Sequence, residues 1–128
     1  MVAPTLSKKE RIVSQKLIET LFGGGNSQSM AAFPLRVVYM RRIRLEQQPP
    51  VQMLVSVPKK RFKHAVDRNR VKRQIREAFR HHKEVLYAAL PSDEQLLIAF
   101  LWLSDRHCAT QEVEQRIEKL IKRLAEKL

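Results

Sequence analysis

The chain has 128 residues, 44% hydrophobic and 30% charged, and its 25 Lys and Arg against 13 Asp and Glu give a net charge of +12. This length supports one modest hydrophobic core, so we expect a single domain over residues 1–128 without wholesale disorder. No apolar stretch reaches the roughly 20 residues of a membrane span, no secretory signal is visible, and the single cysteine, Cys108, excludes an internal disulfide. We therefore expect a cytoplasmic protein.

The first part of the chain predicts a polar arm followed by a helix. Residues 1–10 are expected to form a flexible N-terminal arm. Helical spacing of apolar side chains begins at Ile12, and the glycines from Gly23 onward end it. Ser7 and Ser14 are both suitable N-caps, so the exact start of this helix stays open.

Two strands are expected next. Residues 33–45 and 51–57 show the alternating pattern of strands whose two faces differ, and Pro49 and Pro50 mark the turn between them. In the first strand, one face would carry Leu35, Val37 and Tyr39, and the other Arg36, Val38 and Met40.

The second half predicts a long helix, a strand and a last helix. Asp67 is a suitable N-cap for a helix over residues 68–90, which Pro91 would end. Residues 96–103 form a nearly unbroken apolar run, the pattern of a strand buried on both faces. Thr110 would cap the final helix. The order of elements predicts an α+β fold, a two-layer α-β sandwich with helices packed on a sheet.

The positive charge is concentrated in one segment. Between Lys59 and Lys83 lie eleven basic residues against two acidic ones, so this segment carries +9 of the net charge. Such a density inside a foldable domain is typical of a protein that binds a polyphosphate ligand such as a nucleic acid.

On the predicted long helix, apolar and basic side chains occupy neighbouring arcs. The arc that would pack on the sheet contains Val71, Ile75, Ala78, Phe79 and His82. Backbone N–H groups at the helix start, near Arg68 and Asn69, would suit one phosphate. The basic arc contains Arg68, Lys72, Arg76, Arg80 and Lys83, of which we expect the last two to be solvated.

The sequence RNRVKRQIREAFR over residues 68–80, preceded by VSVPKK over residues 55–60, resembles the signature of the protein subunit of bacterial ribonuclease P. The resemblance extends from Arg11-Ile12 to about residue 90. The last strand and helix match that family only in their order and length.

This resemblance implies a fold, an activity and partners. The fold would be an α-β sandwich with a left-handed βαβ crossover, in the order helix, two strands with an optional third, helix, strand, helix. The chain would be a subunit of an endoribonuclease that removes the 5′ leader of precursor tRNA. Its partners would be the catalytic ribonuclease P RNA, which performs the hydrolysis with Mg²⁺ bound mainly by that RNA, and precursor tRNA. No membrane or obligate protein partner is implied.

The resemblance also implies two binding surfaces. A cleft between the first helix and the sheet would hold the single-stranded leader against Phe22 and Ile18. The second aromatic position of the cleft falls on either Val38 or Tyr39, and we choose Tyr39. Phe100 stands where the family commonly has a basic residue. The surface for the catalytic RNA would comprise Lys59, Lys60, Arg68, Asn69, Arg70, Lys72, Arg73 and Arg76.

The remaining side chains predict neither a catalytic nor a metal site in the protein. The pair His81-His82 and the neighbours His107-Cys108 lack the spacing of zinc ligands. The alternative function is that of a structural RNA-binding protein of the ribosomal type, which would share the size and charge but need no exposed aromatic cleft.

Overall fold

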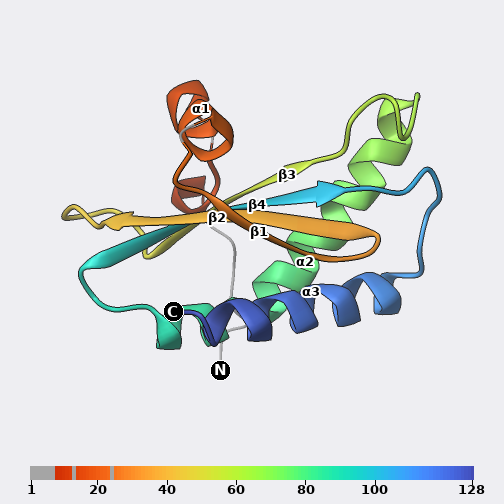
Figure 1. Cartoon of the computed structure of the whole chain (residues 1–128). Coiled ribbons are helices and arrows are strands. Elements are labelled where there is room, and N and C mark those ends of the chain that lie inside the picture. The colour runs from red at the N-terminus through yellow and green to blue at the C-terminus, as the bar shows by residue number, and fades with distance from the viewer. Residues whose placement is uncertain (1–7, 13, 24) are drawn as a thin grey trace.

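The computed structural model describes residues 8–12, 14–23 and 25–128. Over these residues the chain forms a four-stranded sheet with helices on both of its faces (Figure 1). None of the described helices is long and apolar enough to cross a membrane. In chain order the elements are a 3₁₀ turn η1 (Lys8–Glu10), α1 (Gln15–Gly23), β1 (Gln28–Ala32), β2 (Leu35–Ile43), β3 (Val51–Ser56), α2 (Ala65–Ala89), β4 (Glu94–Trp102) and α3 (Thr110–Ala125).

The sheet has the order β1-β2-β4-β3. β1 and β2 form an antiparallel hairpin, β2 pairs antiparallel with β4, and β3 pairs parallel with β4. Two adjacent parallel strands need a crossover connection, which α2 supplies. The α+β sandwich and the order of elements are confirmed, and the optional third strand is β1, which precedes the two predicted strands.

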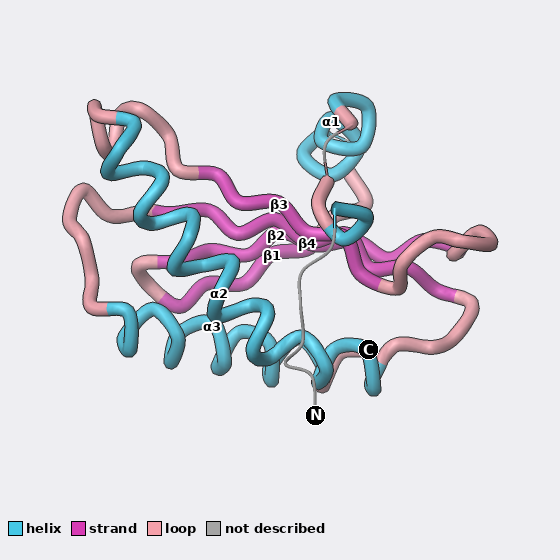
Figure 2. Tube along the Cα trace, turned by 180° about the vertical axis from the view of Figure 1, so that it is seen from behind, coloured by secondary structure: helices cyan, strands magenta, loops and turns pink. Residues whose placement is uncertain are grey.

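The main core lies between the sheet and the layer formed by α2 and α3. Figure 2 shows these elements from behind. Leu35, Val37 and Tyr39 of β2 face this layer, which confirms the predicted alternation. β4 is buried on both faces, also as predicted. Its Phe100 packs edge-on against Phe79 of α2, with ring centroids 5.9 Å apart.

α1 covers the other face of the sheet. Its Leu21 packs with Ile12 and with Leu97 and Ala99 of β4, forming a second and smaller apolar cluster. α1 is short and stands over only part of this face (Figures 1 and 2). The predicted cap at Ser14 is present, since its hydroxyl accepts a long hydrogen bond (3.4 Å) from the Leu17 N–H.

Two predicted helix caps are wrong because tertiary contacts engage the side chains. α2 begins at Ala65 rather than after Asp67, and the Asp67 carboxylate instead lies 3.0 Å from Nε2 of His107. α3 includes Thr110 as its first residue, and the Thr110 hydroxyl accepts a hydrogen bond of 3.0 Å from the Gln74 side chain of α2.

The predicted polar arm is also only partly correct. Its residues 1–7 lie outside the described residues, but Glu10 is buried under the sheet edge. There its carboxylate pairs with the ammonium group of Lys83, which is itself only 5% exposed. The expectation that Lys83 is solvated is therefore wrong.

Candidate nucleic-acid interface

The first turns of α2 present a basic surface to solvent. Arg70 and Arg73 are exposed, and Lys72 and Arg76 are half-buried beside them. None of these four side chains forms an ion pair or a side-chain hydrogen bond within the described part of the chain. Carboxylates of the described residues therefore leave these four charges unpaired, which is the condition for binding an external polyanion. We call these four residues the α2 basic surface.

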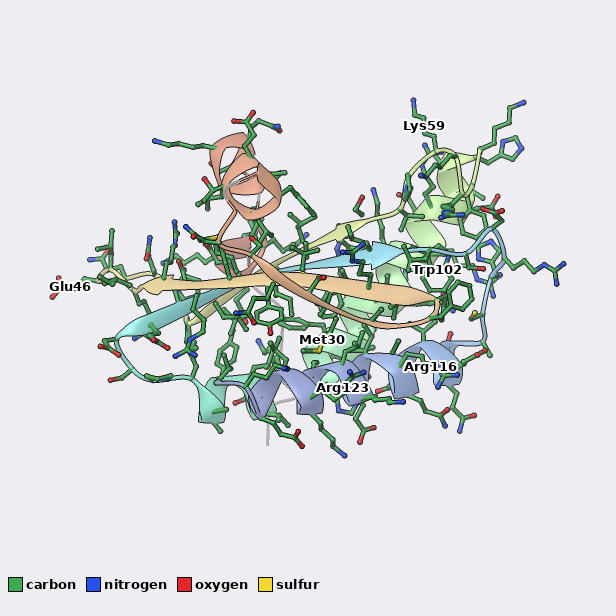
Figure 3. The ribbon with its side chains drawn as sticks, viewed as in Figure 1. Met30, Glu46, Lys59, Trp102, Arg116 and Arg123 are labelled. Carbon is green, nitrogen blue, oxygen red and sulfur yellow. The ribbon has the colours of Figure 1, made fainter. Side chains whose placement is uncertain are left out.

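Two further predicted RNA-binding lysines lie in the turn between β3 and α2. Lys59 and Lys60 are both exposed. Figure 3 shows Lys59 at the end of the molecule opposite the loop that carries Glu46. The turn therefore extends the positive charge of α2 beyond the start of the helix.

A network of side chains ties this turn to α2. One guanidinium nitrogen of Arg68 donates hydrogen bonds of 2.9 Å to the carbonyl oxygens of both Phe62 and Lys63. The Phe62 ring stacks on His107 at 4.5 Å, and His107 in turn contacts Asp67. Arg68, predicted to face the RNA, thus uses part of its hydrogen-bonding capacity to hold the turn.

Asn69 is exposed in the second turn of α2, next to the α2 basic surface. The expected phosphate site at backbone N–H groups near Arg68 and Asn69 is displaced, because the helix starts earlier. The N–H groups of both Asp67 and Arg68 already donate to the His64 carbonyl. A backbone anion site would therefore lie at Ala65, three residues before Arg68.

A groove runs between α1 and the sheet on the side of β1 and β2. Phe22 is 47% exposed at its edge, where the leader cleft was predicted. The cavity measures about 320 Å³. Its walls bring together an aromatic ring, a cation and apolar side chains from Phe22, Arg36, Val38 and Leu101, among others. We call this cavity the Phe22 groove.

Tyr39 does not belong to this groove, and its assignment to the leader cleft is wrong. It is 4% exposed and packs in the core between the sheet and the α2–α3 layer, on the face opposite α1. Its hydroxyl donates a hydrogen bond of 3.0 Å to Gln28, and burial raises its pKa. Of the two alternatives for the second aromatic position, the residue that faces α1 is Val38.

Ile18 lies on the other side of α1, towards the edge strand β3. It lines a second cavity of about 270 Å³ with Arg11, Leu54 and Arg76, among others. Burial lowers the pKa of Arg76, and the positive charge of Arg11 lowers it further. The sequence predicts Arg76 as a contact to the catalytic RNA. In the structure its side chain also lines this cavity beside α1.

Sequence reasoning missed Arg11 and Arg36 as candidate site residues. For Arg36 the signal was available, because the alternation in β2 places it on the same face as Val38. For Arg11 the only signal was the family resemblance, which begins at Arg11-Ile12, since the position of Arg11 in the fold depends on a bridge to Met53, far along the chain.

The described residues include no group of three or more His, Cys, Asp and Glu side chains placed to hold a metal ion. His81 contacts Glu114 of α3 at 2.8 Å, an exposed contact between helices. Phe100 is fully buried, so the position that is commonly basic in the resembled family is a core position here.

Comparisons with known proteins show similarity to ribonuclease P proteins over nearly the whole chain. The family model described as Ribonuclease P matches residues 6–125. The ribonuclease P protein component of Porphyromonas gingivalis is 43% identical over 122 residues, 94% of this chain and 86% of that protein. The protein of the same name from Chlorobium phaeobacteroides is 34% identical over 110 residues, 80% of this chain and 74% of that protein.

Solved structures show the same fold. The ribonuclease P protein of Staphylococcus aureus superposes with a TM-score of 0.70 at 22% identity, covering 90% of this chain and 94% of that one. The protein from Thermotoga maritima gives a TM-score of 0.62 at 20% identity, covering 89% and 96%. The similarity thus includes the last strand and helix, beyond the residues on which the motif resemblance depended.

Proposed function

This chain belongs to the ribonuclease P protein family, and we propose that it binds the catalytic RNA through the α2 basic surface and the 5′ leader of precursor tRNA beside α1. As a member of that family it is a subunit of an endoribonuclease with an RNA partner. The identity of the RNA bound by each surface is the proposal.

The observation that carries the proposal is the set of cations on α2 that pair with no carboxylate of the described residues. Arg70, Lys72, Arg73 and Arg76 project from a helix whose other side is fixed in the core by Val71 and Ile75, among others. Cations held in a rigid row on a helix repel one another when no anion is bound. A phosphate backbone lying along the helix relieves that repulsion. Guanidinium groups also match the geometry of phosphate oxygens.

The Phe22 groove supports leader binding. An exposed aromatic ring offers a stacking platform for an unpaired base, which contributes roughly 1–3 kcal/mol per base. Arg36 in the same groove supplies a cation for the adjoining phosphate. Mature tRNA has no leader, so contacts in this groove favour precursor over product.

We assign phosphodiester hydrolysis to the catalytic RNA, with Mg²⁺ held mainly by that RNA, following the family resemblance. The protein's own residues then bind and orient. The α2 basic surface reduces repulsion between two RNA molecules, and the groove positions the leader next to the bond that is cut.

Reconstitution with a candidate catalytic RNA tests this proposal. We expect the protein to stimulate cleavage of precursor tRNA at low Mg²⁺, where electrostatic repulsion between RNAs is least screened. Lys119 lies on the exposed surface of α3, away from both proposed RNA-binding surfaces. Lys119→Gln therefore removes one charge as a matched control and should stimulate cleavage as much as the wild-type protein does. RNA binding without any stimulation would favour the alternative, a structural RNA-binding protein.

A further inference from the structure

Arg11 and Arg76 come from distant parts of the chain yet line the same cavity at the β3 edge of the sheet. Arg11 follows the turn η1, and Arg76 projects from the fourth turn of α2. The cavity joins the face that carries α1 to the edge of the α2 basic surface. Two guanidinium groups therefore line one cavity on the β3 side of α1, next to the α2 basic surface.

The backbone around Arg11 is held in place by the fold. The Ile12 N–H donates a hydrogen bond of 2.8 Å to the Met53 carbonyl, and Arg11 itself bridges to Met53 in β3. On the other side, Glu10 is buried against Lys83, with Nζ at 3.0 and 2.8 Å from the two carboxylate oxygens. The Tyr87 hydroxyl donates to the same carboxylate. Arg11 is thus fixed between two anchors while its side chain stays exposed.

Placing two cations in one cavity is unfavourable unless an anion joins them. The positive charge of Arg11 lowers the pKa of Arg76 in addition to the effect of burial. Neither side chain forms an ion pair with a carboxylate among the described residues. Two forked guanidinium groups can instead share the oxygens of one phosphate through charge-assisted hydrogen bonds.

We propose that Arg11 and Arg76 form a paired-guanidinium site for a single phosphodiester group of the leader strand. The inference rests on the proposed function and adds a defined phosphate site to it. The cavity also has the apolar neighbours Ile18, Leu54 and Val55. These neighbours favour the single-stranded leader as the RNA that supplies the phosphate. Apolar walls suit an unpaired nucleotide whose base and sugar leave water, whereas phosphates of a double helix contact solvated cations.

The test measures RNA binding by holoenzymes reconstituted with Arg11→Gln, Arg76→Gln or the double variant, with Lys119→Gln as the matched control. Because Arg76 also belongs to the α2 basic surface, each variant is added at a concentration that saturates the catalytic RNA, which filter binding verifies. The probes are precursor tRNA with a leader and mature tRNA, over a range of salt concentrations, and thermal melting verifies that each variant folds. We expect each single variant to lose about tenfold or more in precursor affinity and to keep its affinity for mature tRNA. Because both cations contact one phosphate, the double variant should lose little more than either single variant. In the double variant, the slope of log K for precursor binding against log salt concentration should become shallower by about one.

Three results would overturn the paired site: unchanged precursor affinity in the double variant, equal losses for precursor and mature tRNA, or additive losses with a slope change of about two. The proposed function fails separately, and visibly, if the wild-type protein neither stimulates cleavage nor favours precursor over mature tRNA.

Discussion

Removing the ammonium group of Lys83 is expected to destabilise the protein severely. Lys83 and Glu10 are 5% and 7% exposed, and their two hydrogen bonds are 3.0 and 2.8 Å long. In Lys83→Met an apolar chain of similar length fills the space, while Glu10 loses its counter-charge in a buried site. Breaking a buried ion pair on one side costs about 3–5 kcal/mol, a large share of the ~5–15 kcal/mol that stabilises a typical domain.

The double variant Glu10→Gln with Lys83→Met separates charge from packing. It leaves neither charge behind, and the amide oxygen at position 10 can still accept the Tyr87 hydroxyl hydrogen bond. Burial, together with the hydrogen bond to Glu10, raises the pKa of Tyr87, so this hydroxyl stays a donor. Because replacing both members of a buried pair is often neutral, the double variant should be more stable than Lys83→Met alone.

Urea denaturation followed by circular dichroism measures both effects. With a slope of about 1.5 kcal/mol/M, a loss of 3–5 kcal/mol lowers the midpoint by roughly 2–3 M. A Lys83→Met midpoint within about 0.5 M of the wild type would contradict a stabilising role of the buried ion pair. A double variant less stable than Lys83→Met would refute it as well, because the cost would then not lie in an unpaired charge.

Further expectations concern the two binding surfaces and the thiol. Replacing Arg70 and Arg73 together with Gln should weaken binding to the catalytic RNA and reduce the salt slope by about two; wild-type affinity and slope in filter binding would contradict the α2 assignment. Phe22→Ala should weaken precursor binding by about 5- to 150-fold, equivalent to 1–3 kcal/mol, and spare mature tRNA, whereas equal losses would remove the groove from leader binding. Tyr39→Phe keeps the core ring and should leave precursor affinity unchanged, so a leader-specific loss there would return Tyr39 to the cleft. Burial, with the nearby Glu112 charge, raises the pKa of the Cys108 thiol; iodoacetamide should therefore alkylate it more slowly than in urea-unfolded protein at pH 7 and faster as pH rises, and equal rates at pH 7 would contradict this.

Features that depend on local periodicity were predictable from the sequence. The apolar arc of α2, with Val71 and Ile75 at helical spacing, identified the side that packs on the sheet. The alternation in β2 grouped Tyr39 with Leu35 and Val37, and all three are buried together. The same alternation already argued against placing Tyr39 in a cleft on the opposite face, but the resemblance to a family with an aromatic cleft outweighed it.

Features that depend on distant partners were not predictable. The ion pair between Glu10 and Lys83 joins residues 73 positions apart, and each residue alone reads as a solvated charge. Asp67 has the side chain of an N-cap, but it lies inside the first turn of α2, where its carboxylate contacts the distant His107. β1 was missed as a definite strand because only Met30 in it is buried, which leaves almost no alternation to detect.

The proposed function requires that the protein distinguish precursor from mature tRNA by holding the leader beside α1 while α2 contacts the catalytic RNA. The most direct measurement is the ratio of Kd values for mature and precursor tRNA, determined with the catalytic RNA alone and with the holoenzyme. We expect that adding the protein raises this ratio, and that removing the leader abolishes the gain. A ratio that is the same with and without the protein would contradict it.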